Sequence, residues 1–311
     1  MPHRRIIIDT DPGIDDAVAI LLALGSPELE VAGLVAVAGN LGIAPVLRNA
    51  GAVTELAGRG DIPVYAGCPR PIGPLQPDAA AAHGEEGLGN LVLPPPAVAP
   101  RSQHGVAFLI ETLRDAEPHS LTLCALGPLT NIATALVMGP DITRGVAELV
   151  IMGGGSHGNV TPAAEFNIHA DPQAARVVFD SLLPITLVPL DVTEQVRSTA
   201  ERIAMVRAAG TRCAEAVAEL LSPQRPAAPG QPGRPAMAMH DPCVIAYLLA
   251  PGLFSGRRAR VAIETASPLT LGMTVIDRRS PSPPPPHALV LETVDVDGVY
   301  RLLAERMARL P

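Results

Sequence analysis

The sequence has 311 residues, of which 48% are hydrophobic but only 2% aromatic, and its formal net charge is −8. This length fits one large α/β domain, and the apolar content suffices for a core built from aliphatic side chains. The acidic balance argues against a nucleic-acid or anionic-membrane surface, so we expect neither partner.

The four cysteines and the N-terminal residues favour a reduced, cytoplasmic compartment. Cys68, Cys124, Cys213 and Cys243 are far apart and lack metal-type spacing, so we expect small buried residues of a reduced compartment. The chain enters an apolar strand directly after MPHRR, without an apolar signal core, and contains no apolar run long enough to cross a bilayer. We therefore expect a soluble, cytoplasmic protein.

The stretch IIIDTDPGIDDA, residues 6–17, carries the clearest signal. Its β-branched residues predict a short buried strand, its Pro-Gly pair a turn, and its last two aspartates the start of a helix. The carboxylates of Asp9, Asp11, Asp15 and Asp16 therefore surround one turn, at the strand end where open α/β sheets bind ligands. Such close carboxylates repel one another unless a cation lies between them, and a hard divalent cation is the natural candidate. The alternative is that Asp15 only caps the helix while Asp9 and Asp11 are solvated.

The chain alternates strands and helices throughout. After the first strand, further strands are expected at residues 31–38, 62–66, 121–126, 147–152, 185–190, 260–265 and 289–292. Helices are expected at 16–24, 45–57, 105–114, from 130, from 172, at 201–221, from 241 and at 296–310. This alternation predicts an α/β fold with a mostly parallel open sheet flanked by helices, in a single domain over residues 1–311.

Polar residues follow several of these strands or open the helices behind them. They are Asn40, Thr130, Asn159, Glu165, Asn167, His240 and Asp241. The apolar Met152 ends one of the strands and is followed by three glycines. His83, in the loop that leads to residue 100, is either solvated or part of the same rim. Because the carboxyl ends of parallel strands meet at one edge of a sheet, we expect a single site there.

Five motifs together resemble those of the inosine–uridine-preferring nucleoside hydrolase family. They are DTDPGIDDA, GPLTNIA, IMGGG, AEFNIHADPQAA and MHDP, which follow the family's order. The resemblance implies a Rossmann-like nucleoside hydrolase fold and hydrolysis of the N-glycosidic bond of ribonucleosides to ribose and free base. It also implies a role in nucleoside salvage and a homodimer or homotetramer.

The resemblance further implies a role for each candidate residue. Ca²⁺ would be held by Asp11, Asp16, the backbone carbonyl of Thr130 and Asp241, in agreement with the irregular oxygen shells that this ion accepts. Asp11 would also be the general base toward a water beside the ion, and His240 the acid that protonates the leaving base. The substrate-binding residues would be Asp15, Asn40, His83, Met152, Asn159, Glu165, Asn167 and Asp241.

Two segments depart from the family pattern. After His83 the sequence reads GLGN where the family usually has an aspartate and a glycine. Residues 222–236, which we expect to form a mobile loop near the site, contain no aromatic residue to contact a base. The base preference among purine, pyrimidine and modified nucleosides is therefore open.

Two other functions remain compatible with parts of the sequence. A phosphohydrolase with two aspartates after its first strand would need Thr or Val where this chain has Pro12-Gly13, and also a later lysine. A non-catalytic nucleoside or ribose binder would keep the fold while losing turnover. The joint presence of Asp11, Asp16 and His240 favours the enzyme over the binder.

Overall fold

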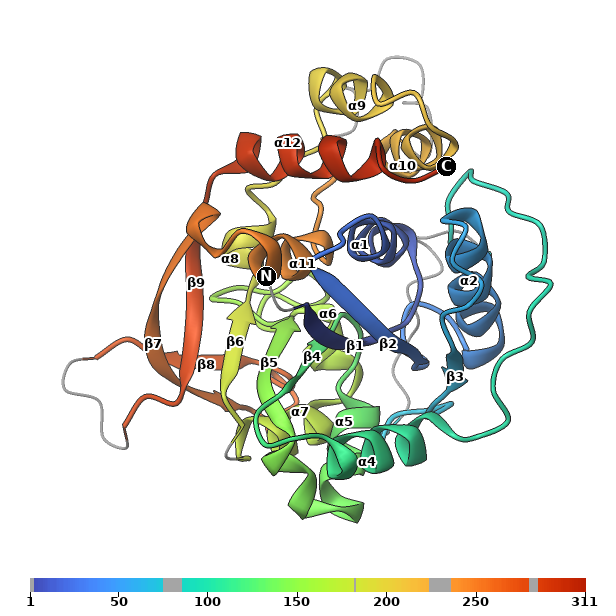
Figure 1. The fold of residues 1–311 in the computed structure, drawn as a ribbon. Helices are drawn as coiled ribbons and strands as arrows, with labels where there is room; N and C mark the ends of the chain where they lie inside the picture. The colour runs from blue at the N-terminus through green and yellow to red at the C-terminus, as the bar shows by residue number, and fades with distance from the viewer. Residues whose placement is uncertain (1–2, 75–85, 182, 224–235, 280–284) are drawn as a thin grey trace.

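A computed structural model describes residues 3–74, 86–181, 183–223, 236–279 and 285–311. One sheet runs through the molecule, and helices cover both of its faces (Figure 1). The strands are β1 (Arg4–Thr10), β2 (Leu29–Ala36), β3 (Val64–Ala66), β4 (Leu121–Ala125), β5 (Val146–Met152), β6 (Ile185–Val188), β7 (Phe254–Ile263), β8 (Thr274–Asp277) and β9 (Ala288–Val294). The helices are α1 (Ile14–Leu24), α2 (Ile43–Leu56), α4 (Gly105–Asp115), α5 (Thr130–Met138), η1 (Pro140–Arg144), α6 (Phe166–Ala170), α7 (Pro172–Phe179), α8 (Leu190–Thr193), α9 (Ala200–Arg207), α10 (Arg212–Leu221), α11 (Pro242–Leu249), η2 (Pro251–Leu253) and α12 (Val296–Met307).

The strand order determines where a ligand can bind. The order is β3-β2-β1-β4-β5-β6-β9-β7-β8, in which β1 to β6 and β9 are parallel while β7 and β8 are antiparallel to their neighbours. The chain proceeds from β1 toward β3 on one side and from β4 toward β6 on the other. The direction reverses between β1 and β4, so the crevice beyond their carboxyl ends is the expected ligand site.

Strand β1 divides the core into its two layers. Ile6 and Ile8 are fully buried against α1 and its neighbours, whereas Ile7, also fully buried, packs in the layer beneath α4, α5 and α7. This alternation is the period of two that a strand covered on both faces requires. Each such side chain contributes about 1.5–3 kcal/mol of burial free energy, which fixes β1 and the aspartates at its end.

The predicted fold class is confirmed, but one predicted helix is wrong. Residues 201–221 form two helices, α9 and α10, because Gly210 adopts a left-handed φ of +73° and Thr211 caps α10 by accepting a bond from the Ala214 amide. The structure also adds β8 and the short helices α6 and α8, none of which the sequence predicted. Most of the loop predicted at 222–236, and His83, lie outside the described residues.

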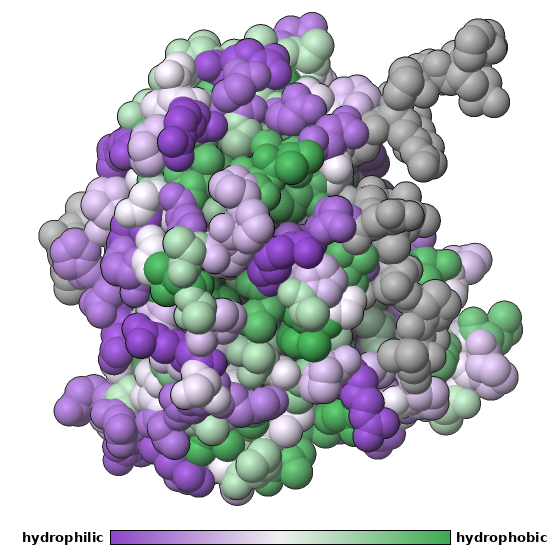
Figure 2. Space-filling model, turned by 90° about the vertical axis from the view of Figure 1, so that its right-hand side faces the viewer, coloured by the Kyte–Doolittle hydropathy of each residue, from purple (hydrophilic) through white to green (hydrophobic). Residues whose placement is uncertain are grey.

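The face shown in Figure 2 has mixed polarity, and the described cysteines are mostly buried. On the face carrying α2, apolar patches alternate with hydrophilic residues (Figure 2), as on most folded surfaces. Cys124, Cys213 and Cys243 are buried free thiols and Cys68 is half-buried; burial raises the pKa of Cys124 to about 12. Among the described residues, no helix is both long and apolar enough to span a membrane.

Candidate active site

The turn from β1 into α1 is closed by one carboxylate. Asp16 accepts hydrogen bonds from the backbone amides of Asp11 (3.2 Å) and Gly13 (3.0 Å), and from the hydroxyl of Thr10 (2.5 Å). A carboxylate in the first turn of a helix also interacts favourably with the helix dipole. Asp16 therefore shapes the loop around itself while remaining fully buried.

Asp11 is held between two glycines with one oxygen unsatisfied. Its Oδ2 accepts the backbone amide of Asn40 (2.6 Å), and the Asn40 side-chain amide donates to the Asp11 carbonyl and to Asp16 (both 3.1 Å). Its buried Oδ1 has no hydrogen-bond partner. A Cβ at Gly39 or Gly127 would lie 2.1 or 2.3 Å from the Asp11 carboxylate, so only glycine leaves room for it there.

Three carboxyl groups converge at this turn. Asp15, Asp16 and Asp241 each offer an oxygen, and these oxygens lie within 4.8 Å of one another. Burial raises the pKa of Asp11 and of Asp241 well above the usual range, and the neighbouring carboxylates raise both further. The raised pKa values mean that the carboxyl groups cannot all ionise easily unless a positive charge lies between them.

A hard divalent cation fits these residues. The candidate ligand atoms are all oxygens, the Asp11 Oδ1 near them is buried without a partner, and the carboxyl groups need a positive charge between them to ionise together. The convergence differs in one respect from the predicted ligand set. Asp15, predicted to contact ribose, lies in the cluster with Asp16 and Asp241, whereas Asp11 is oriented by Asn40 beside it.

Thr130, whose backbone carbonyl is the predicted ligand, is the first residue of α5 and takes part in a second network of polar side chains. The Thr130 carbonyl accepts the Thr134 hydroxyl (2.7 Å), and the Thr130 hydroxyl donates to buried Asp171 (2.7 Å). Next to it, the Asn131 amide donates to Asp9 (2.9 Å), whose pKa burial raises to about 8 against the effect of this bond. The Asn131–Asp9 bond joins α5 to β1 and the Thr130–Asp171 bond joins it to the N-terminus of α7, so the first turn of α5 is fixed at the crevice.

A cavity of about 300 Å³ opens in front of the acidic cluster. Predicted site residues that line it are Asp15, Asn40, Met152, Asn159, Glu165, Asn167, His240 and Asp241. Lining residues that the sequence reasoning missed are Ile14, Leu126, Val160, Phe166, Met237 and Ala238. Five of them, Ile14, Val160, Phe166, Met237 and Ala238, are within three positions of predicted residues, and this proximity was the available signal.

The polar residues on the far side of this cavity are held by backbone groups. Glu165 caps α6 and accepts the backbone amides of Gly154, Asn167 and Ile168; burial raises its pKa to about 7 although these bonds lower it. The Asn167 side-chain amide donates to the Leu126 carbonyl (2.7 Å). Both side chains therefore have a fixed orientation before any ligand arrives.

His240 lies at the opposite wall, directly before Asp241. Its Nδ1 is 2.7 Å from the hydroxyl of Thr193, a residue that no sequence pattern singled out. The imidazole is the one side chain lining the cavity whose ordinary pKa suits proton donation near neutral pH. The cavity thus combines an acidic, oxygen-rich cluster with a histidine directly next to one of its members.

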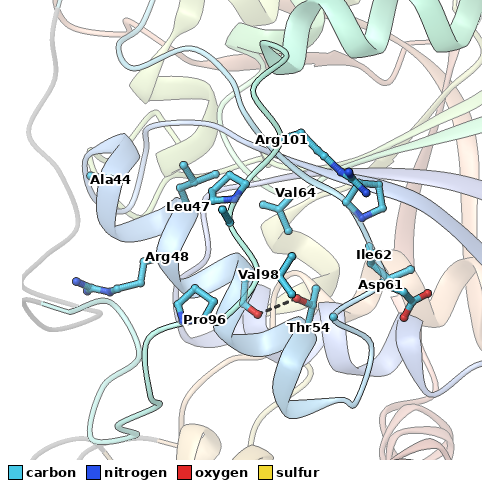
Figure 3. Close-up of a pocket in the computed structure, with 15 residues that line it drawn as sticks. Ala44, Leu47, Arg48, Thr54, Asp61, Ile62, Val64, Pro96, Val98 and Arg101 are labelled. Carbon is cyan, nitrogen blue, oxygen red and sulfur yellow. Dashed lines mark hydrogen bonds between the residues drawn. The ribbon is translucent and has the colours of Figure 1, made fainter.

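A second cavity, of about 220 Å³, lies away from this edge, between α2, β3 and residues 96–101 (Figure 3). Its centre is apolar, with Leu47, Val64 and Val98 around it, and the Thr54 hydroxyl bonds a carbonyl of its own helix. The Asp61 carboxylate pairs with Arg59. None of the predicted site residues lines this cavity.

Replacing Gly127 with alanine tests the tight fit around Asp11. The added Cβ would lie 2.3 Å from Oδ1 and 2.8 Å from Cγ of Asp11, so the carboxylate must move. We expect kcat/KM of the reaction at this site to fall by about a hundredfold or more, because a shift of about 1 Å in a reacting group has that cost. The control is Gly252→Ala, whose Cβ would meet nothing within 4 Å. An unchanged kcat/KM for Gly127→Ala would show that this fit is unimportant.

Comparison with known proteins identifies relatives over the whole chain. Residues 6–301 match the description "inosine-uridine preferring nucleoside hydrolase". The chain is 39% identical to the inosine-uridine preferring nucleoside hydrolase of Crithidia fasciculata (99% of this chain, 98% of the relative). It is 43% identical to the pyrimidine-specific ribonucleoside hydrolase of Citrobacter koseri (97% of each). The solved structure of a plant nucleoside hydrolase superposes with a TM-score of 0.88 at 32% identity, over 99% of both chains.

Proposed function

The chain belongs to the inosine-uridine preferring nucleoside hydrolase family, and on that premise we propose that it hydrolyses ribonucleosides with Ca²⁺ as its cofactor. The family makes it a ribonucleoside hydrolase, an N-glycosidase of the EC 3.2.2 type acting on small-molecule nucleosides. Membership of this family rules out the phosphohydrolase alternative. The identity of the cation and the role of each residue are our proposal.

The observation that carries the calcium proposal is the convergence of Asp15, Asp16 and Asp241 beside the unsatisfied oxygen of Asp11. We assign Asp11, Asp16, Asp241 and the Thr130 carbonyl as ligands. When bound, the cation supplies positive charge that acidifies a nearby water and orders the ribose hydroxyls. Irregular oxygen ligation of this kind suits Ca²⁺ better than Mg²⁺, which demands a near-octahedral shell.

Each residue of the site has its own role in the proposed reaction. Asp11 accepts the proton of the attacking water, and His240 gives a proton to the departing base. Asp15, Asn40 and Asn167 hold the 2′- and 3′-hydroxyls, Asn159 and Glu165 hold the 5′-hydroxyl, and Met152 lies against the sugar. The transition state is oxocarbenium-like, so the carboxylates around the ribose favour it electrostatically.

Removing the cation should abolish turnover and lower stability together. Chelation followed by dialysis is expected to stop ribose release from uridine and inosine, and added Ca²⁺ should restore it. Ca²⁺ at about 100 times its Kd should also add about 2.7 kcal/mol to the free energy of unfolding, because it binds only the folded cluster. Thermal unfolding with and without Ca²⁺ measures this independently of activity. Full activity after exhaustive chelation would contradict the proposal.

The same assay with a panel of nucleosides determines the base preference. The relatives named above are described as inosine-uridine preferring and as pyrimidine-specific, so they leave the preference open. We propose that the described apolar wall formed by Val160, Phe166 and Met237 accepts the base. The homodimer or homotetramer and the cytoplasmic location stay predictions, and light scattering of the purified protein would measure the first.

A further inference from the structure

His240 lines the cavity, but one of its contacts is with a residue that does not. Its Nδ1 lies 2.7 Å from Oγ1 of Thr193, the last residue of α8 and 47 positions earlier in the chain. Thr193 has no exposed surface. A hydroxyl at this distance forms a hydrogen bond with the ring, and water cannot compete for it.

The backbone on both sides of this contact is fixed. Residues 196–198 pair antiparallel with residues 237–239: the Met239 amide donates to the Val196 carbonyl and the Ser198 amide to the Met237 carbonyl, both at 2.9 Å. Helix α8 is in turn joined to the end of β5 by the bond from the Leu190 amide to the Gly154 carbonyl (2.9 Å). The Thr193 hydroxyl is therefore presented to His240 from a rigid position.

We propose that Thr193 is a positioning residue, whose hydroxyl fixes the His240 ring so that Nε2 serves the leaving base. This inference rests on the acid role proposed above for His240. The partner of one imidazole nitrogen determines which nitrogen is left for the substrate. A hydroxyl can accept from a protonated Nδ1 or donate to an unprotonated one, so the bond persists in every protonation state of the ring.

The contact at Nδ1 is compatible with the transfer of the proton on Nε2. The C1′–N bond breaks with its electron pair retained by the base, and the proton on Nε2 moves to a ring nitrogen of that base. The Nδ1 proton stays on His240, and the Thr193 oxygen accepts it before and after the transfer. The ring therefore has no need to turn during the step. Without the hydroxyl, Nδ1 loses the bond that orients it.

Thr193→Val, which preserves shape but removes the hydroxyl, tests this proposal. We expect kcat on uridine and inosine to fall by about tenfold to a hundredfold with little change in KM, as expected for a misplaced reacting group. The loss on a nitrophenyl riboside, whose leaving group needs no proton, should be much smaller. Thr193→Ser keeps the hydroxyl and should restore most of kcat. Thr193→Ala is a second hydroxyl-free variant if the valine variant does not fold.

Two comparisons separate this role from a structural one. Thr54→Val removes another buried hydroxyl, one that bonds only its own helix in Figure 3, and should leave both substrates unaffected. Equal losses on both substrates in Thr193→Val would overturn the positioning role. If His240→Ala discriminates between the substrates and Thr193→Val does not, the acid role stands and this inference fails. If His240→Ala does not discriminate, the acid role and this inference fail together.

Discussion

Replacing Asp11 with asparagine is expected to lower kcat by about a thousandfold, within the range that general-base catalysis contributes. The amide oxygen can keep the bond from the Asn40 backbone, so the loop should retain its shape. The amide nitrogen then takes the place of the unsatisfied Oδ1, and the residue can no longer accept a proton from water. KM should change much less than kcat, because the ribose contacts are unaltered.

Steady-state kinetics on uridine and inosine, together with calorimetric titration of Ca²⁺, measure this result. Asp61→Asn is the matched control, since Asp61 is a surface carboxylate paired with Arg59 and far from the sheet edge. A loss of Ca²⁺ affinity with kcat intact at saturating Ca²⁺ would make Asp11 a ligand only. The free energy of unfolding without Ca²⁺ should rise in Asp11→Asn, because one of the repelling charges is gone.

Replacing His240 with alanine should have an effect that depends on the leaving group. On natural nucleosides we expect kcat to fall by about a hundredfold to ten-thousandfold, the range for loss of a general acid. On a nitrophenyl riboside the fall should be small, since nitrophenolate leaves without a proton. The Asp241 side chain beside it keeps its place in the acidic cluster, so Ca²⁺ binding should persist.

The ratio of the two kcat losses is the quantity to measure. It is insensitive to partial misfolding, which reduces the concentration of active enzyme equally for both substrates. Thermal unfolding in Ca²⁺ confirms that the variant is folded. A uniform loss would remove His240 from the acid role and leave it a wall of the cavity.

The sequence was sufficient to predict the acidic half of the site. Asp11, Asp15 and Asp16 surround one turn, so local pattern alone brings them together, and the parallel-sheet rule brings Asn40 to the same edge. The place of Asp241 in the cluster was implied by the family resemblance of the MHDP motif. Hydrophobic runs fixed the strands from β1 to β6 because strands buried on both faces have continuous apolar sequence.

The rest depended on contacts between distant segments. Thr193 and His240 are 47 residues apart, and no periodicity connects a buried threonine to a histidine. The helix predicted at 201–221 failed because its apolar pattern continues through Gly210, whose left-handed backbone ends one helix before Thr211 starts another. The strand β8 is a four-residue edge strand, too short for its pattern to be distinguished from a loop.

The antiparallel pairing of residues 196–198 with 237–239 has a consequence for how such enzymes diverge. The chain leaves the site at Ser198 and returns at Met237 to the same place, so its two ends are fixed independently of what connects them. Doubling the length of a flexible connection costs only about 0.6 kcal/mol. The connecting segment also carries α9 and α10, whose Val206, Cys213 and Leu220 are buried in the core. Changes of length during evolution are therefore confined to the part between Leu221 and Met237, and they leave His240 and the acidic cluster in place.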